Sequence, residues 1–467
     1  MRSPGMAVVQ RMRSIIHNSP SGKREGVHVE SGPIAPVLLS FALPVLLIQL
    51  LQELYNITDC MVVGHFGGEY ALAATGVAGL LLSILINFFI GFSSGVSGVV
   101  SRLFGAYEYA ALKRTVNAVF RLVVVTGLVL SVLGIASADL LLRLMRSPAE
   151  VVPHAMIYLR ICACGLTAQM VYNVGAAFLR SIGDTRTPLY YYLVSVLCNL
   201  ALDVLLVVVL HMGVAGAAWA TLFSQWLLAL MIVRYMARLD PDYALEPFGP
   251  GLSMGELSRV LGIGIPSGMQ ALFMSISSFL IQACINGFGP DAIAGMTVFA
   301  KLEGFVYLPT FAYGIALTSF VGQNLGAGKI ARIRETVRLS LRLMAAAIIP
   351  LSLALTVASP LLLRLFTHDG DILFNAREAV ACILPFYAVY GFNQVFLGVI
   401  KGLGNTTWPM LCTLLCYSLF RVLWCHGLIP AHPTMRVVYF SYVVSFFLML
   451  ALLVPVYLRR IRALERR

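Results

Sequence analysis

Long apolar runs alternate with short polar segments along almost the whole chain. A membrane-spanning helix needs about 20 predominantly apolar residues, and the sequence contains twelve runs of that kind. They are centred near residues 48, 85, 127, 167, 198, 225, 272, 307, 346, 387, 416 and 446. The pattern predicts an all-α integral membrane protein with twelve transmembrane helices.

The second half of the chain repeats the first half at a nearly constant offset. The segment 140–144 reads LLLRL and recurs at 361–365, and Gly105-Ala106 recurs as Gly326-Ala327. Each copy holds six predicted helices, so both copies enter the membrane from the same side. We therefore predict two six-helix lobes related by a pseudo-twofold axis along the membrane normal, as in transporters that work by alternating access.

The predicted organisation has five parts. Residues 1–34 are polar and form an N-terminal cytoplasmic tail, which we expect to be mobile. The N-lobe (35–236, helices 1–6) and the C-lobe (259–458, helices 7–12) flank a linker at 237–258 that is rich in Pro and Gly. Residues 459–467 form a C-terminal tail.

Composition agrees with a membrane protein, and charge fixes its expected orientation. The chain is 59% hydrophobic and 12% charged, with a net charge of +12 and a mean hydropathy of +0.86. The termini, the linker and the loops on the same side hold 24 of the 33 Lys and Arg residues. By the positive-inside rule both termini are cytoplasmic, in the plasma (inner) membrane. This distribution favours a lipid bilayer as the partner and excludes nucleic acid.

No pattern of catalytic residues stands out. The nine cysteines lie within or at the ends of apolar runs, which is typical of small packing residues. The eight histidines are scattered, mostly at the ends of the predicted spans, and no phosphate-binding loop is present. We therefore predict that the protein is not an enzyme and carries no cofactor.

Two aspartates occupy positions where carboxylates are rare. Asp59 lies near the end of the first apolar run and Asp203 lies in the middle of the fifth. An ionisable group at membrane depth costs roughly 3 kcal/mol or more, so it is seldom kept without a partner, a water-filled cavity or a function. Simple helix packing is the alternative, and the position of both acids favours function.

Other polar side chains accompany the two acids. On the first helix, Gln52 and Asn56 share a face with Asp59, and on the fifth helix Asn199 precedes Asp203 by one turn. The sixth helix presents Thr221 among small residues, and the fourth offers Tyr158 and Asn173. If these faces converge, their oxygen atoms suit a small hard cation. Burial and a second nearby carboxylate also favour protonation, so a proton is equally suitable.

The second copy of the repeat lacks this acid pair. In the register that aligns Gly105 with Gly326, the equivalents of Asp59, Asn199 and Asp203 are Leu280, Phe420 and Trp424. A register shifted by one position, which aligns Pro44 with Pro266, gives Ile281, Arg421 and Cys425 instead. The packing residues are kept in both copies, whereas the acids occur in one. This asymmetry is typical of a specialised ion site and favours function over packing.

The second copy has charged residues of its own. Lys301 and Glu303 lie in the eighth helix, on different faces, and Arg421 lies in the eleventh. We regard all three as candidate cavity charges of the C-lobe. Arg421 either faces the acids of the first lobe across the cavity or ties helices together, and the sequence leaves both open.

At these residues the chain resembles the multidrug and toxic compound extrusion (MATE) transporters, over about residues 35–458. The matching patterns are Pro44 with Leu54-Tyr55-Asn56-x-x-Asp59, Gly91 to Gly105-Ala106, Arg180-x-x-Gly183-Asp184-Thr185, Asn199-x-x-x-Asp203, Gly216-Ala217-Ala218-x-Ala220-Thr221, and Gly322-Gln323-Asn324-x-Gly326-Ala327. Each pattern is weak alone, but their joint order along the chain is specific.

The resemblance implies a monomeric antiporter that exports small organic compounds, often cationic and amphipathic, against an inward flow of sodium ions or protons. In the branch that this chain resembles most, the ion site lies in the N-terminal lobe. Its residues correspond here to Asp59, Asn199, Asp203 and Thr221, with Tyr158 and Asn173 as looser matches. Sodium or a proton would bind there. Other branches carry acids in helices 7 and 10 that this chain lacks.

Several alternatives stay open. A lipid-linked precursor flippase of the same wider superfamily is the nearest, although such proteins often carry a more basic cavity. A channel or a membrane-embedded enzyme is less consistent with a one-lobe acid site in a doubled fold. The sequence predicts neither the substrate nor the choice between sodium and proton.

Overall fold

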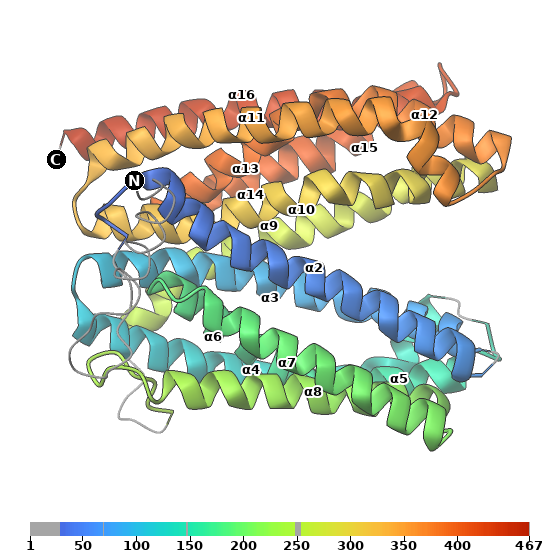
Figure 1. Cartoon of the computed structure of the whole chain (residues 1–467), viewed down its shortest axis with the longest axis horizontal. Helices are drawn as coiled ribbons and strands as arrows, with labels where there is room; N and C mark the ends of the chain where they lie inside the picture. Colours follow the sequence, from blue (N-terminus) through green and yellow to red (C-terminus); the bar gives the residue numbers. More distant parts are fainter. Residues whose placement is uncertain (1–28, 69, 146–147, 248–253, 467) are drawn as a thin grey trace, which may run out of the picture.

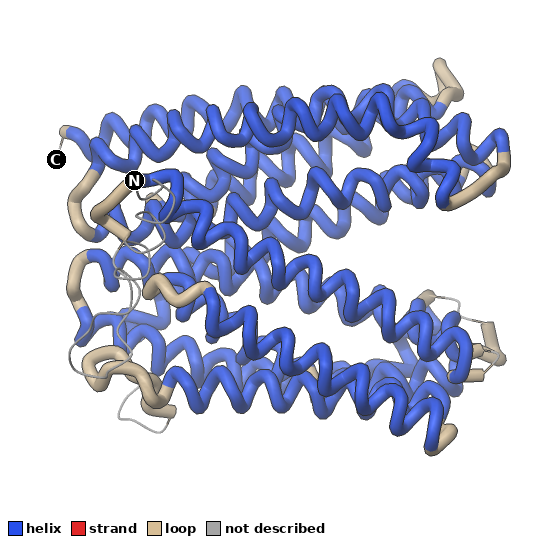
Figure 2. The backbone as a smooth tube through the Cα atoms, in the orientation of Figure 1, coloured by secondary structure: helices blue, strands red, loops and turns tan. Residues whose placement is uncertain are grey.

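The computed structural model describes residues 29–68, 70–145, 148–247 and 254–466, and helices account for most of them (Figure 2). Residues 1–28 of the predicted tail and residues 248–253 of the predicted linker lie outside the described part. Within the described ranges no strand occurs. The all-α prediction is confirmed.

The first six predicted spans correspond to eight helical elements. These are α2 (Ile34–Phe66), α3 (Ala71–Gly105), α4 (Tyr109–Leu144), α5 (Val152–Ala163), α6 (Leu166–Ser181), α7 (Arg186–Asp203), the π-helical turn η1 (Val204–Val209) and α8 (Gly213–Met236). Pro44 lies inside α2 and does not end it.

The last six predicted spans correspond to eleven elements. These are α9 (Met254–Asn286), α10 (Pro290–Gly326), α11 (Ile330–Leu362), η2 (Leu363–Leu365), α12 (Gly370–Ile383), η3 (Leu384–Phe386), α13 (Tyr387–Gly402), α14 (Thr407–Thr413), η4 (Leu414–Leu419), α15 (Phe420–Leu428) and α16 (Met435–Glu465). Among them η2 and η3 are 3₁₀ turns and η4 is π-helical.

The number of spans agrees with the prediction. Eleven helices of the described chain are long and apolar enough to cross a membrane, and α5 with α6 forms a twelfth that bends by 45°. The bend lies at Cys164 and Gly165. Their repeat equivalents, Pro385 and Phe386, lie within η3, which interrupts the tenth span between α12 and α13. Both copies of the repeat therefore depart from regular α-helix at the same place, and the N-lobe copy is bent there.

The helices form two groups that lie side by side (Figure 1). The elements α3 to α8 make up one group and α9 to α16 the other. Helix α2 starts beside the second group and ends beside the first, in agreement with its packing against both α10 and α7. The first helix of the N-lobe thus contacts both halves of the molecule.

The two groups meet closely at the end where the chain termini lie. A Cβ atom on Gly105 of α3 would collide with the backbone of Gln323 in α10, and one on Gly326 of α10 would collide with the carbonyl group of Arg102. The hydroxyl groups of Ser97 and Ser319 lie 2.9 Å apart across the same boundary. Gly105 and Gly326 are repeat equivalents, so the duplicated glycines pack against each other. We call this boundary the seam.

The described end of the predicted N-terminal tail is bound to the seam. The Val29 N–H donates to the Gln323 side-chain oxygen at 3.0 Å, and Lys329 donates to the Glu30 carbonyl at 3.0 Å. Tyr107 donates its hydroxyl proton to the Glu30 carboxylate at 2.7 Å. Hydrogen bonds thus hold the described end of the tail, while the mobility of the tail stays a prediction.

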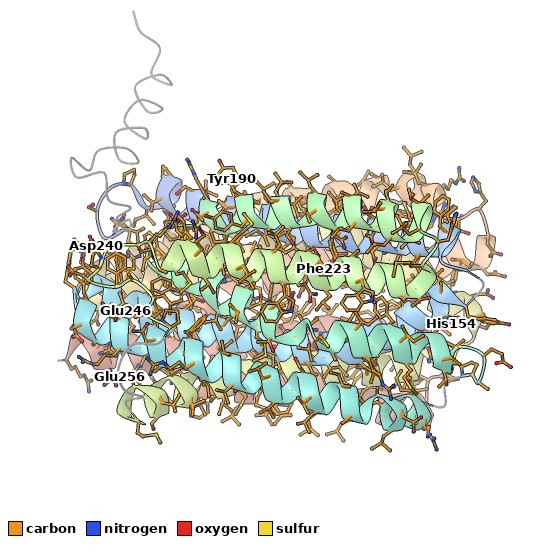
Figure 3. All side chains as sticks on the ribbon, turned by 90° about the horizontal axis from the view of Figure 1, so that it is seen from below. His154, Tyr190, Phe223, Asp240, Glu246 and Glu256 are labelled. Atoms are coloured by element: carbon orange, nitrogen blue, oxygen red, sulfur yellow. The ribbon has the colours of Figure 1, made fainter. Side chains whose placement is uncertain are left out.

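Charged side chains hold the connecting segments at that same end. Lys113 pairs with Glu246 at 2.6 Å and Arg114 with Glu256 at 2.8 Å. Figure 3 shows Glu246 and Glu256 at one end of the molecule and His154 at the opposite end. Residues 459–465 of the predicted C-terminal tail continue α16 as helix.

Candidate functional site

Asp59 and Asp203 come together inside the N-lobe. Asp59 lies on α2 and is 8% exposed, whereas Asp203 is the last residue of α7 and is 0% exposed. The two carboxylates are close enough for their charges to interact. The backbone changes from α-helix to the π-helical η1 directly after Asp203, and such π-bulges are frequent at functional sites.

Four buried polar atoms of this site make no hydrogen bond within the described residues. They are one carboxylate oxygen of Asp59, both carboxylate oxygens of Asp203 and the side-chain nitrogen of Asn199. Leaving a buried polar atom unpaired costs about 1–3 kcal/mol, so their number indicates a ligand. Carboxylate and amide oxygens suit a hard cation, and the carboxylates also suit a proton.

Hydroxyl groups surround the acid pair. Thr221 on α8 is buried and accepts a hydrogen bond from the Tyr55 hydroxyl at 3.1 Å. Tyr158 on α5 is buried and lies near enough to Asp59 for the two groups to interact. In the described part of the chain no three His, Cys, Asp or Glu side chains gather as metal ligands. A cation held here would therefore use hydroxyl and amide oxygens beside the carboxylates.

Sequence reasoning did not assign Tyr55 to the site. Its position was visible in the motif Leu54-Tyr55-Asn56-x-x-Asp59, one turn before Asp59. Tyr55 links α2 to α8 through Thr221. The spacing of four positions from Asp59 would have placed both side chains on neighbouring parts of the helix surface.

Three predicted supporting residues lie outside this acid pocket. Asn56 is exposed and lines a cleft on another face of α2. Asn173 is buried, but its side-chain nitrogen donates to the Gln169 carbonyl of its own helix at 3.0 Å. Gln52 is half-buried and lies beside Tyr192. The expected polar stripe of the first helix therefore divides between the acid pocket and the cleft.

The cleft has a volume of about 510 Å³ and lies between α2 and α10. Its lining residues are Glu53, Asn56, Ile57, Cys60, Met61, Gly64, His65, Leu72 and Lys301. Most of them recur at spacings of three and four along α2, so one face of this helix forms most of the wall. Glu53 was not predicted, although a carboxylate inside an apolar run was the signal that identified Asp59.

The charged residues predicted for the C-lobe separate into two sets. Lys301 lines the cleft. Glu303 accepts a hydrogen bond from the Tyr387 hydroxyl at 2.9 Å and interacts electrostatically with Arg421. These contacts place Glu303 and Arg421 in one network inside the C-lobe.

Arg421 is buried among aromatic rings. Its guanidinium lies 4.2 Å from the ring centre of Tyr442 and 4.8 Å from that of Tyr417. Its side chain donates to the Ser445 hydroxyl at 2.9 Å. Such stacking stabilises a desolvated cation. Of the two open readings, these contacts favour Arg421 as a tie between α15 and α16.

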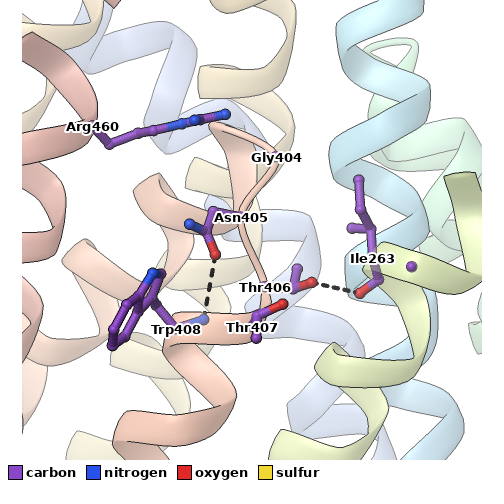
Figure 4. Close-up of a pocket in the computed structure, with 8 residues that line it drawn as sticks. Ile263, Gly404, Asn405, Thr406, Thr407, Trp408 and Arg460 are labelled. Carbon is purple, nitrogen blue, oxygen red and sulfur yellow. Dashed lines mark hydrogen bonds between the residues drawn. The ribbon is translucent and has the colours of Figure 1, made fainter. Parts of the chain in front are cut away.

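A smaller cavity of about 340 Å³ lies in the C-lobe, at the turn between α13 and α14 (Figure 4). Thr406 there donates to the Ile263 carbonyl of α9 at 2.8 Å, and the Asn405 side chain accepts from the Trp408 N–H at 3.3 Å. None of the predicted site residues lines this cavity. It lies where the turn between α13 and α14 contacts α9.

The fold agrees with solved structures of transporters. A MATE protein described as in the bent conformation has a TM-score of 0.87 at 22% identity, over 95% of this chain and 99% of that one. A structure described as the outward-facing conformation of a multidrug resistance MATE family transporter has a TM-score of 0.85 at 22% identity, over 96% of this chain and 100% of that one. The chain therefore has the two-lobed helical fold of these proteins.

Sequence comparison gives the family. The MatE family model matches residues 44–205 and again 266–425, and the chain belongs to that family. Membership places it among transporters and not among enzymes. The two matches begin at Pro44 and Pro266, which are equivalent positions of the internal repeat.

Curated relatives carry names of the same kind. The "Probable multidrug resistance protein YpnP" of Bacillus subtilis is 28% identical over 394 residues, covering 84% of this chain and 87% of the relative. The "FAD transporter" of Shewanella oneidensis is 28% identical over 349 residues, covering 73% of this chain and 76% of the relative.

Proposed function

We propose that this protein is a cation-coupled antiporter that exports amphipathic organic compounds carrying a cationic group by alternating access. The observation that carries the proposal is the pair Asp59 and Asp203, buried in one lobe with unpartnered oxygens. The multidrug resistance names of its relatives support drug-like substrates.

The proposed orientation has both termini in the cytoplasm, which agrees with the excess of Lys and Arg on that side. The seam then closes the cytoplasmic end. The cleft is lined by Gly64 and His65 near the end of α2 and by Leu72 near the start of α3. It therefore opens toward the outside, and the conformation is outward-open.

Helix α2 couples ion to substrate in this proposal. Asp59 lies on its buried face, and Glu53, Asn56 and Cys60 lie on its cleft face. A ligand shifts a conformational balance only by its different affinity for the two states. Neutralising Asp59 and Asp203 from outside would change the packing of α2 and with it the cleft, so that ion and substrate exclude each other.

The coupling ion is sodium or a proton, and the donor set of the pocket suits both. A flippase of the same superfamily stays the second candidate. The cleft wall carries one acid, Glu53, and one base, Lys301, beside His65. A multiply charged phosphate headgroup would match a more basic wall than this.

Efflux from reconstituted vesicles tests the proposal. Vesicles loaded with a fluorescent dye that carries a cationic group, in a purely cationic or a zwitterionic form, receive either a pure sodium gradient or a pure pH gradient. We expect dye export against its own gradient with one of the two. Export under neither gradient, or passive equilibration alone, would refute antiport and indicate a flippase or a channel.

Matched variants identify the residues. Asp59→Asn and Asp203→Asn should each abolish gradient-driven export. Asp139→Asn, which alters an exposed ion pair with Arg143 at the far end of α4, should export at the wild-type rate. Wild-type rates for both pocket variants would disprove the assignment of the site.

A further inference from the structure

Glu53 and Lys301 are two ionisable residues that share one cleft and come from different lobes. Glu53 is on α2 and Lys301 on α10. Both side chains are exposed, and neither forms an ion pair with another described residue within 4.0 Å. The acid and the base are therefore both available to a ligand in the cleft.

Their depth along the helices favours a cleft filled by water or ligand over one filled by lipid. Along its helix, Glu53 lies roughly 20 Å before the end of α2 at Phe66, and Lys301 lies roughly 16 Å after the start of α10 at Pro290. Glu53 thus lies near the middle of α2, and Lys301 lies about a third of the way along α10. Exposed charges at that depth almost always face a water-filled cavity.

The rest of the wall is largely apolar. Ile57, Met61 and Leu72 are 44%, 60% and 52% exposed, and all three line the cleft. Drug-sized ligands bind in pockets of about 300–1,000 Å³ with apolar walls and a few polar groups that fix orientation. A cleft of about 510 Å³ is of that kind.

We infer that the cleft selects amphipathic zwitterions, binding an ammonium group at Glu53 and a carboxylate at Lys301, with the apolar body against α2. The inference rests on the proposed export function and narrows its substrate class. A purely cationic compound would face Lys301 without a counter-charge, and a purely anionic compound would face Glu53.

Three fluorescent compounds with one common dansyl group test the inference. Dansyl-lysine with a free amine and a free carboxylate is the zwitterion, dansylcadaverine is the cation and dansyl-norleucine is the anion. Binding is measured by dansyl fluorescence with the full-length protein in nanodiscs, where no gradient exists. We expect wild type to bind dansyl-lysine at least tenfold more tightly than either analogue.

The variants separate the two charges. Glu53→Gln should reduce dansyl-lysine binding to the level of the anion and leave dansyl-norleucine binding no weaker. Lys301→Met should reduce it to the level of the cation and leave dansylcadaverine binding no weaker. The exchange variant E53K/K301E keeps both charges and should recover much of the zwitterion preference. Arg143→Met, outside the cleft, is the control and should behave as wild type.

The labelling rate of Cys60 measures occupancy of the cleft independently, because Cys60 is exposed and lines the cleft. Dansyl-lysine should slow its labelling by a water-soluble maleimide, and Cys60→Ser shows which label belongs to it. Equal affinity for the three compounds, or selectivity that both variants leave unchanged, would overturn the inference. Variants that change Cys60 labelling alike with every compound would also overturn it and indicate a gate formed by the two residues.

The binding test of charge selectivity and the gradient test of antiport have independent outcomes. Charge selectivity is measured without a gradient, so its absence leaves gradient-driven dye export intact. Conversely, a protein that binds dansyl-lysine selectively but exports no dye under either gradient would refute the antiporter and keep the cleft assignment.

Discussion

Replacing Asp203 by Asn should stabilise the ion-free protein and abolish its stabilisation by the coupling ion. Asp203 is 0% exposed, and both of its carboxylate oxygens are unpartnered within the described structure. It also interacts with the charge of Asp59. An ionisable group at membrane depth costs about 3 kcal/mol, and Asn removes the charge while keeping the shape. We expect the free energy of unfolding without ion to rise by about 1–3 kcal/mol.

With the coupling ion present, wild type should become more stable than Asp203→Asn. A ligand that binds only the folded state stabilises it by RT ln(1 + [L]/Kd), which is about 2.7 kcal/mol at a hundred times Kd. Wild type should gain this amount and Asp203→Asn should gain none. The stability curves of the two proteins should therefore cross as ion is added.

Thermal unfolding of purified protein measures both effects. Sodium is titrated against choline at alkaline pH, where protons compete least, and in a second series pH is lowered without sodium. Asp184→Asn is an informative contrast, because Asp184 accepts a hydrogen bond from Tyr235 at 2.7 Å. That variant should lose about 1 kcal/mol and keep its ion response. An Asp203→Asn protein that melts below wild type without ion, or that keeps the wild-type ion response, would refute the reasoning.

Three further predictions concern other contacts. Tyr55→Phe removes the 3.1 Å bond to Thr221. Its loss should cost about 1 kcal/mol of ion-binding free energy, so the ion affinity measured in the same thermal titration should fall about fivefold. An unchanged affinity would place Tyr55 outside the site. Gly105→Val collides with the Gln323 backbone and should open the seam. A Ser319→Cys reporter, buried in the seam, should then become reactive to maleimide. Gly79→Val in the same helix, with open space around it, should leave the labelling of the reporter unchanged. Arg421→Met removes the stacking on Tyr442 and Tyr417 and the bond to Ser445. It should cost about 1–2 kcal/mol and lower the melting temperature. Because Arg421 also interacts with Glu303, adding Glu303→Gln should restore part of the loss; additive losses would show that the two residues do not interact.

The overall fold was predictable from hydropathy because in a bilayer every backbone polar group must be satisfied within the segment. Apolar runs therefore become helices almost without exception, and the repeat gave their pairing into lobes. Finer features came from tertiary contacts. The tail before α2 is polar, and its order at Val29 and Glu30 comes from hydrogen bonds to Gln323 and Lys329, far away in the sequence.

The acid pocket was predictable in part. Helical spacing identified Asp59, and Asn199 with Asp203, because a carboxylate in an apolar run stands out from its neighbours. It did not separate the two faces of α2. Asn56 and Asp59 are three positions apart, only about 60° around the helix, yet one lines the cleft and the other is buried. The boundary between those faces depends on where α7 and α10 pack, which no local pattern encodes.

Arg421 shows how the buried charges of the two lobes differ. In the register that aligns Pro44 with Pro266, Arg421 corresponds to Asn199 of the acid pocket. Where the N-lobe presents open carboxylates, the C-lobe holds a guanidinium that is bound to Ser445 and surrounded by rings. That cation is part of the chain and cannot leave, so its charge balance is independent of any gradient. In the proposed antiport cycle, the charge of the N-lobe would change with the ion supply, whereas the C-lobe would keep a fixed charge.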